Sequence, residues 1–151
     1  MHKKIISNNK KASFNYFLEN KLEVGIVLTG SEVKSIRLGK INIEDAYASF
    51  HKEELFLYNA HISLYDKASY QNHHPTNPRK LLLHKAEARK MLGKVQKKGY
   101  TIVPISVYFN EKNLVKLEIA LASGKKQHDK RHAIKQRDWD REQKALLKLK
   151  S

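Results

Sequence analysis

Residues 22–50 constrain the fold of this chain most, because their hydrophobic pattern changes period within a few positions. The segment begins with strict alternation, the period of a half-buried β-strand, and its apolar positions are Leu22, Val24, Ile26 and Leu28. Thr29 and Glu32 then have the spacing of a capping box, in which each side chain pairs with a backbone N–H of the first helical turn. The pattern therefore predicts a strand that leads directly into a helix.

This helix is expected to be short and basic. Val33 and Ile36 share one face, and Gly39 is placed to end the helix in the left-handed conformation. The helix also carries Lys34 and Arg37, and a second strand is expected to begin near Ile41. A strand, a two-turn helix and a return strand would form a compact basic corner.

Weaker patterns predict the elements around this corner. A short first strand is suggested by Ile5 and Ile6. A helical turn that packs on the core is suggested by the spacing of Phe14, Phe17 and Leu18. Two β-rich runs, 46–50 and 55–60, flank four polar residues and predict a hairpin with a four-residue loop.

Residues 66–79 are polar, contain Pro75 and Pro78, and predict a long mobile loop. The adjacent histidines His73 and His74 cannot complete a metal site by themselves, and no Asp, Glu or His stands at ligand spacing to help. We therefore expect solvated histidines and no metal.

An amphipathic helix is predicted over His84–Lys98, followed by strands at 101–109 and 114–121. A charged outer face is usually only solvated, but the near-absence of acidic residues on this one favours phosphate contact. Pro104 cannot donate to a strand ladder, which implies an edge or a bulge. Five or six short strands without a βαβ rhythm predict a mostly β fold: a small antiparallel barrel with flanking helices.

The pattern changes at Gly124, after which strand alternation ends and charge dominates. We divide the chain into a barrel domain, residues 1–123, and a basic tail, residues 124–151, that is disordered in isolation. The tail lacks helix breakers after Gly124, and three apolar residues can share one helical face: Trp139, Leu146 and Leu149. We expect it to become helical on a partner.

Positive charge gathers at the two ends of the chain. The net charge is +15, from 30 Lys and Arg against 15 Asp and Glu. Residues 1–11 contain four lysines and no acidic residue, and residues 124–151 contain ten basic and four acidic residues. Two basic arms suit a polyanion, whose counterions are released when Lys and Arg neutralise phosphates. The alternative is a cationic surface that serves solubility alone.

Other classes are disfavoured by composition. The chain has no cysteine, which excludes disulfides and thiolate chemistry and is compatible with a reducing cytoplasm. No apolar run reaches the length of a membrane span, and the basic N-terminus lacks the apolar core of a signal peptide. Neither arm has the large apolar face of an interfacial helix. We expect a cytoplasmic protein with no membrane partner.

No catalytic site is predicted. His128 with Asp129, and His132 with Asp138, resemble acid–base pairs, but they lie in the segment least able to hold a fixed geometry. The sequence has no phosphate-binding glycine loop, nucleophile motif or metal cluster. We predict a binding protein and not an enzyme, with no cofactor.

Four blocks occur in a fixed order between about Asn9 and Trp139: GIVLTGSEVKSIRLGKINIEDAY, RKLLLHKAE, GKV-x-x-KGYTIVPIS and GKKQHDKR. Together they closely resemble the small protein B family, the SsrA-binding proteins of bacterial trans-translation. The resemblance implies a barrel of the oligonucleotide/oligosaccharide-binding (OB) type. It implies an RNA-binding adaptor whose barrel grips the tRNA-like domain of transfer-messenger RNA (tmRNA, SsrA). Such an adaptor delivers this RNA to the vacant decoding site of a stalled ribosome for rescue and peptide tagging, while its tail enters the empty mRNA channel.

The same resemblance implies the residues that contact each partner. The RNA-binding set would be Asn9, Lys11, Glu23, Lys34, Arg37 and Lys116. The ribosome-binding tail set would be Lys125, Lys126, His128, Asp129, Lys130, Arg131, Ile134, Lys135 and Trp139. The family usually has a histidine where this chain has Phe14, although a phenyl ring can also stack on a base.

Residue types alone leave other interpretations open. Asn9 would be assigned to a polar turn, and Glu23 to a solvent-facing strand position. A carboxylate can also accept hydrogen bonds from an exposed base edge. For the whole chain, the alternatives are a generic RNA-binding or ribosome-associated barrel and, far behind it, a hydrolase acting on nucleic acid.

Overall fold

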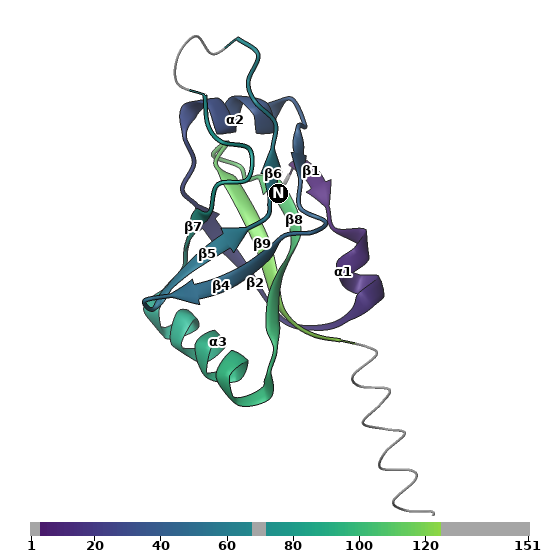
Figure 1. Cartoon of the computed structure of the whole chain (residues 1–151), viewed down its shortest axis with the longest axis vertical. Coiled ribbons are helices and arrows are strands. Elements are labelled where there is room, and N and C mark those ends of the chain that lie inside the picture. Colours follow the sequence, from purple (N-terminus) through teal and green to yellow (C-terminus); the bar gives the residue numbers. More distant parts are fainter. Residues whose placement is uncertain (1–3, 68–71, 125–151) are drawn as a thin grey trace, which may run out of the picture.

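A computed structural model describes residues 4–67 and 72–124, whose strands form an antiparallel barrel (Figure 1). The barrel strands are β2 (Tyr16–Ile26), β4 (Tyr47–His51), β5 (Glu54–Tyr58), β7 (Arg79–Leu82), β8 (Thr101–Phe109) and β9 (Val115–Gly124). They pair in the order β8-β4-β5-β7-β2-β9, and β9 pairs back to β8, so the ring is closed. Closure removes the exposed sheet edges that would otherwise pair with other chains.

Within residues 4–67 and 72–124, three further strands lie outside the ring. Strand β1 (Lys4–Asn8) adds to the half of β8 that contains Ser106 and Phe109. Strands β3 (Ile41–Asn42) and β6 (His61–Ile62) form a small separate sheet. The expected mostly β fold, a small OB-type antiparallel barrel with flanking helices, is confirmed, with more strands than the five or six predicted.

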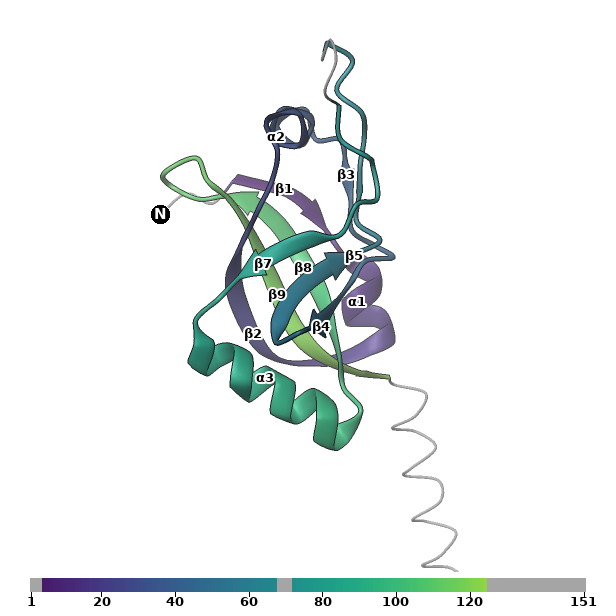
Figure 2. The ribbon, with the colours of Figure 1, turned by 60° about the vertical axis from the view of Figure 1, so that its left-hand side comes forward.

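The three helices found in the described residues sit on different sides of the barrel. Helices α2 (Gly30–Arg37) and α3 (Lys85–Lys98) lie at opposite ends, as both ribbon views show (Figures 1 and 2). Helix α1 (Lys10–Asn15) lies against the side, where Ala12 packs with β8 and β9. In the described residues no helix is long and apolar enough to cross a membrane.

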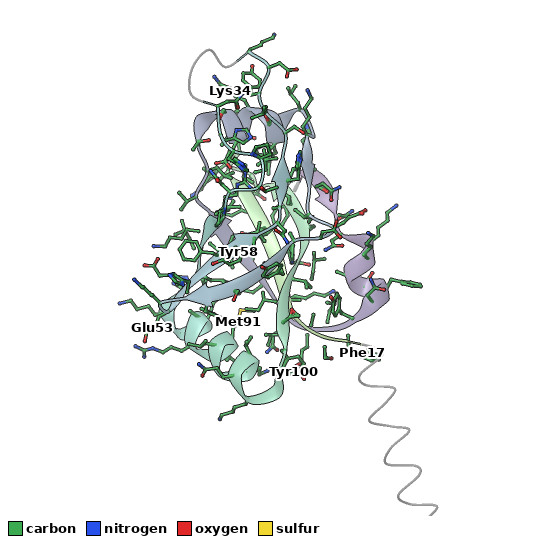
Figure 3. The ribbon with its side chains drawn as sticks, viewed as in Figure 1. Phe17, Lys34, Glu53, Tyr58, Met91 and Tyr100 are labelled. Atoms are coloured by element: carbon green, nitrogen blue, oxygen red, sulfur yellow. The ribbon has the colours of Figure 1, made fainter. Side chains whose placement is uncertain are left out.

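One continuous core fills the ring, because the inward positions of the strands are apolar. Alternate residues of β9, Leu117, Ile119 and Leu121, are fully buried, as the alternation in the sequence predicts. Helix α3 closes one end of the core with Met91, which Figure 3 labels. Helix α2 contributes Ile36 at the other end.

The predicted capping box at the start of α2 is confirmed. The Thr29 backbone N–H donates to Glu32 Oε1 at 2.8 Å, and the Glu32 N–H donates to Thr29 Oγ1 at 3.4 Å. Gly39 has a φ of 74°, the left-handed conformation expected after the helix. Glu32 also forms a buried ion pair with Arg79, which donates further to the Ala60 carbonyl at 2.7 Å.

The Pro104 prediction is also confirmed, in its bulge form. The register between β8 and β9 shifts between Pro104 and Ser106, which leaves Ile105 as the extra residue. The carbonyls of Pro104 and Ile105 accept hydrogen bonds from Asn9, through the side-chain amide at 2.9 Å and the backbone N–H at 2.7 Å. The bulge therefore ties the start of α1 to the barrel.

Three local predictions are wrong. The β4–β5 hairpin has a two-residue turn instead of a four-residue loop, because Lys52 and Glu53 both adopt positive φ, of 51° and 66°, as a tight primed turn requires. Helix α1 packs through the small Ala12, and Phe14 is 78 % exposed. Phe17 and Leu18 belong to β2 and not to a helical turn.

The third wrong prediction is the solvated histidine pair in the loop. His73 is buried, and its Nε2–H donates to the Ile62 carbonyl at 2.9 Å, while Nδ1 lies 2.9 Å from Ser31 Oγ. His74 is exposed, as expected. Within residues 4–67 and 72–124, no group of three or more His, Cys, Asp or Glu side chains could hold a metal.

Candidate nucleic-acid interface

The outer face of β2, β9 and β8 brings together two of the residues that the sequence singled out. Antiparallel pairing places Glu23 directly opposite Glu118, and Lys116 opposite both Gly25 and Tyr108. Since opposite residues of a strand pair project from the same side of the sheet, these side chains share one surface. We call this surface, defined by Glu23, Gly25, Lys116, Glu118 and Tyr108, the β2–β9 wall.

Tyr108 holds Glu23 in place on this wall. Its hydroxyl donates a hydrogen bond to Glu23 Oε2, and the ring itself is buried. Burial raises the pKa of Tyr108 above its ordinary value, and the carboxylates of Glu23 and Glu118 raise it further. The phenol therefore keeps its proton and remains a donor, which orients the Glu23 carboxylate on an otherwise open strand face.

The wall is bordered by apolar side chains. One cross-strand row runs from Leu82 through Gly25, Lys116 and Tyr108 to Ile5. Its two ends, Leu82 and Ile5, are 51 % and 57 % exposed. A carboxylate, an ammonium group and exposed apolar ends in one patch can accept from a base edge, pair with a phosphate and contact a ribose or base face.

Sequence reasoning missed Tyr108 as a member of the wall and Leu82 as part of its apolar border. The alternation of β2 placed Glu23 outward, but the partners of that face depend on strand register, which the two bulges of β2 and β8 alter. The sequence did contain one local indication of this face, because Lys116 and Glu118 alternate with buried residues of β9.

The basic corner predicted around α2 forms a second group at the end of the barrel. Lys34 and Arg37 are exposed, and Lys34 Nζ lies 5.5 Å from the centroid of the Tyr65 ring, within the range of a cation–π contact. Figure 3 shows Lys34 at this end. The Ser35 hydroxyl donates to the Ser63 carbonyl at 2.7 Å and fixes the helix to the chain beside it. The corner thus holds Lys34 and Arg37 on a helix that is fixed to the barrel.

Asn9 has a structural role that the polar-turn interpretation did not anticipate. Its side chain is only 5 % exposed and caps α1 by accepting from the Ala12 N–H at 3.2 Å. Its amide nitrogen donates to the carbonyls of Ile43 and Pro104, at 3.3 and 2.9 Å. Since both ends of the amide are occupied by protein, Asn9 fixes the position of α1 on the barrel.

Lys11 extends from the same helix toward two acidic residues. Its Nζ lies 3.7 Å from Glu44 and 3.9 Å from Asp45, and the side chain remains 57 % exposed. An exposed pair of this kind is weak and leaves the lysine available to a stronger anion.

The predicted ribosome-binding set lies outside the described residues: Lys125, Lys126, His128, Asp129, Lys130, Arg131, Ile134, Lys135 and Trp139. The acid–base pairs considered above, His128 with Asp129 and His132 with Asp138, lie outside them as well. The structure gives only the attachment point of this segment, Gly124, which pairs with Tyr16 at the end of β9.

Comparison with known proteins places this geometry in a family. The family described as SmpB protein matches residues 6–149. The SsrA-binding protein of Rickettsia canadensis (strain McKiel) is 56 % identical over 149 residues, which cover 99 % of this chain and 98 % of the relative. The SsrA-binding protein of Rickettsia bellii (strain OSU 85-389) is 55 % identical and covers 99 % of both chains.

A solved structure gives the same result. A chain of the structure described as "tmRNA-SmpB: a journey to the center of the bacterial ribosome" matches with a TM-score of 0.66 and 46 % sequence identity. The match covers 79 % of this chain and 83 % of that one. The resemblance in the four sequence blocks therefore extends to the whole fold, and this chain belongs to the SmpB protein family.

Proposed function

We propose that this protein is an RNA-binding adaptor that binds the tRNA-like domain of tmRNA and delivers it to stalled ribosomes for trans-translation. Its relatives are named SsrA-binding proteins, and the similar solved structure is named for tmRNA–SmpB and the bacterial ribosome. A net charge of +15 suits both RNA partners.

The observation that carries this proposal is the β2–β9 wall. Glu23, oriented by Tyr108, is an acceptor for a base amino or imino group, and Lys116 supplies a cation beside it. The basic corner with Lys34 and Arg37 adds phosphate contacts at the end of the barrel, and Lys11 adds one near α1. Asn9 belongs to the site as the residue that positions α1.

Residues 1–123 form the RNA-binding domain, and residues 124–151 occupy the empty mRNA channel, with His128 and Trp139 as stacking anchors. The protein works in the cytoplasm as an adaptor, without catalysis, cofactor or metal.

Selective binding tests the proposal against a generic RNA-binding barrel. The full chain should bind the tRNA-like domain of tmRNA more tightly than an elongator tRNA at equal salt, measured by filter binding. Equal affinity for the two RNAs would favour the generic barrel. Cleavage of either RNA would favour the hydrolase.

Truncation before Lys125 tests whether the barrel domain binds the RNA and the tail acts on the ribosome. We expect the truncated protein to retain selective binding of the tRNA-like domain and to lose peptide tagging on stalled ribosomes in a reconstituted translation system. Trp139→Ala should act in the same direction, since stacking on a base is worth about 1–3 kcal/mol. Normal tagging by the truncated protein would contradict the assigned role of the tail.

A further inference from the structure

A hollow of about 500 Å³ lies beside the end of β9. The strand ends at Gly124, which pairs with Tyr16, and Tyr16 lines the hollow. The lining also includes residues of α1, of β8 and of the segment that leads into β4. Figures 1 and 2 show α1 next to the end of β9. We call this space the α1–β4 hollow, and Gly124 lies at its edge.

The charged side chains that line this hollow are Lys11, Glu44 and Asp45, so one ammonium group faces two carboxylates. Lys11 Nζ lies 3.7 Å from Glu44 and 3.9 Å from Asp45, whose side chains are 43 % and 85 % exposed. A carboxylate has about four lone-pair sites, and one exposed lysine at these distances does not fill them. The hollow therefore has a net negative charge and acceptor capacity for further cations.

Aromatic rings give the hollow a second feature that suits cations. Tyr16 and Tyr47 line it, and Tyr47 is 43 % exposed. The Tyr47 ring stacks on Tyr58 with centroids 5.5 Å apart, which holds it in place. The face of a tyrosine ring attracts Lys and Arg, and Lys34 uses Tyr65 in this way at the basic corner. The lining thus favours a segment rich in Lys and Arg over an acidic or an apolar one.

The chain supplies such a segment directly after Gly124. Residues 125–131, KKQHDKR, contain four basic residues and one acidic residue, and we call them the tail root. They lie outside the described residues, but their attachment point at the edge of the hollow is described. Seven residues span at most about 25 Å, so the first basic side chains begin within reach of the hollow. A tethered segment also has an effective concentration on the order of millimolar, which favours it over a separate basic protein.

We propose that the α1–β4 hollow binds the tail root of the same chain while the protein is free of the ribosome. Basic side chains of the root pair with Glu44 and Asp45 and lie against the tyrosine rings. The inference rests on the proposed function in one respect: the root belongs to the set expected to contact the ribosome, so the hollow and the mRNA channel compete for it. The hollow keeps the start of the tail on the barrel until a ribosome with an empty channel takes it.

The test uses the full chain at low salt, without RNA or ribosome. The ¹H–¹⁵N heteronuclear NOE of the backbone amides in residues 125–131 reports whether the tail root is ordered. We expect values close to those of the barrel strands. They should fall to those of an unfolded segment at about 1 M salt, where the Debye length is only about 3 Å. An intramolecular contact does not depend on protein concentration, so a fall on dilution would contradict it and assign the hollow to the tail of a second copy.

Neutral variants test the role of the carboxylates. Glu44→Gln combined with Asp45→Asn keeps the side-chain shapes and removes both charges, and it should lower the NOE of the tail root to that of an unfolded segment. The matched control is Glu53→Gln combined with Glu54→Gln in the β4–β5 turn. It removes the same charge outside the hollow and should leave the NOE unchanged. All four positions are exposed, so circular dichroism should show an unchanged fold in both variants.

Paired charge reversal tests whether these groups meet. Glu44→Lys with Asp45→Lys should release the tail root, and so should Lys125→Glu with Lys126→Glu. The four changes together should restore its order. Restoration requires contact between the reversed groups, because a general effect of net charge does not depend on which positions are changed.

Two outcomes would overturn the assignment. One is a tail root that is already unordered in the original protein at low salt. The other is a root whose NOE is equally high in the Glu44→Gln, Asp45→Asn variant, which would mean that it folds without the hollow. Neither outcome affects the proposed function, since selective RNA binding and peptide tagging are measured separately. An ordered root in a protein that fails to tag would contradict the proposed function alone.

Discussion

The basic corner around α2 and the β2–β9 wall are connected along the chain, because β2 leads into α2, but they differ in how far their polar side chains are buried. At the corner, polar groups bond to one another: Glu32 to Arg79, and Ser31 to His73. On the wall, Glu23 accepts a hydrogen bond from Tyr108, but its exposed carboxylate also faces that of Glu118 across a strand pair. Like charges in that position destabilise a sheet. Stability explains the buried pairs of the corner, whereas the facing carboxylates of the wall fit the proposed RNA binding.

The degree of burial distinguishes polar side chains that stabilise the fold from those that can bind a ligand. Arg79 is 3 % exposed and bonds to Glu32 and to the carbonyls of residues 60, 74 and 75. Among the described residues, no buried side-chain nitrogen or oxygen lacks a partner. A buried polar group with all its bonds made holds the fold, and an exposed one has capacity for a ligand.

The largest expected effect on stability comes from breaking the Glu32–Arg79 ion pair at the corner. Arg79→Leu leaves the Glu32 carboxylate buried without its cation, so the free energy of unfolding should fall by about 3–5 kcal/mol in urea denaturation. The matched control is Lys80→Ala on the neighbouring strand position, whose exposed pair with Glu54 spans 3.4 Å and should be worth only about 0.2–1 kcal/mol. Equal losses for the two variants would contradict the structural role of the corner.

A smaller loss of stability is expected at Asn9. Asn9→Ala removes the α1 cap and two hydrogen bonds to buried carbonyls, and it should cost about 2 kcal/mol. Any loss of RNA affinity should accompany this loss of stability. A variant with unchanged stability but weaker RNA binding would instead make Asn9 a direct contact.

Cations at the corner should change RNA binding without changing the fold. Lys34→Ala and Arg37→Ala are surface changes that should alter unfolding free energy by at most about 0.5 kcal/mol. Each should lower the slope of log K against log salt for tmRNA by roughly 1, if each pairs with one phosphate. An unchanged slope in both variants would remove the corner from the interface.

Local patterns allowed most elements of this fold to be predicted. The strand–cap–helix sequence around Thr29 and Glu32, the helix predicted over His84–Lys98 and the irregularity predicted at Pro104 all follow from interactions within a few residues. Capping and helix-ending interactions join residues that are close in sequence, so they can be recognised from residue types and spacing alone.

Contacts between distant residues were not predictable in the same way. The burial of His73 depends on Ser31 and Ile62, and the place of Tyr108 on the wall depends on bulges in two strands. The tight β4–β5 turn was missed because Lys52 and Glu53 are not residue types that favour positive φ. The RNA-binding residues themselves came from family resemblance and remain predictions.

Glu23→Gln tests the central claim most directly. The change keeps the shape of the side chain and removes the carboxylate that Tyr108 orients, and Glu19→Gln, at an exposed glutamate of the same strand, is the matched control. We expect Glu23→Gln to weaken binding of the tRNA-like domain by about tenfold or more, while unfolding free energy changes by no more than about 0.5 kcal/mol. Glu19→Gln should change neither quantity. Unchanged affinity in Glu23→Gln, or an equal loss in Glu19→Gln, would contradict the assignment of the β2–β9 wall as the surface that recognises the RNA.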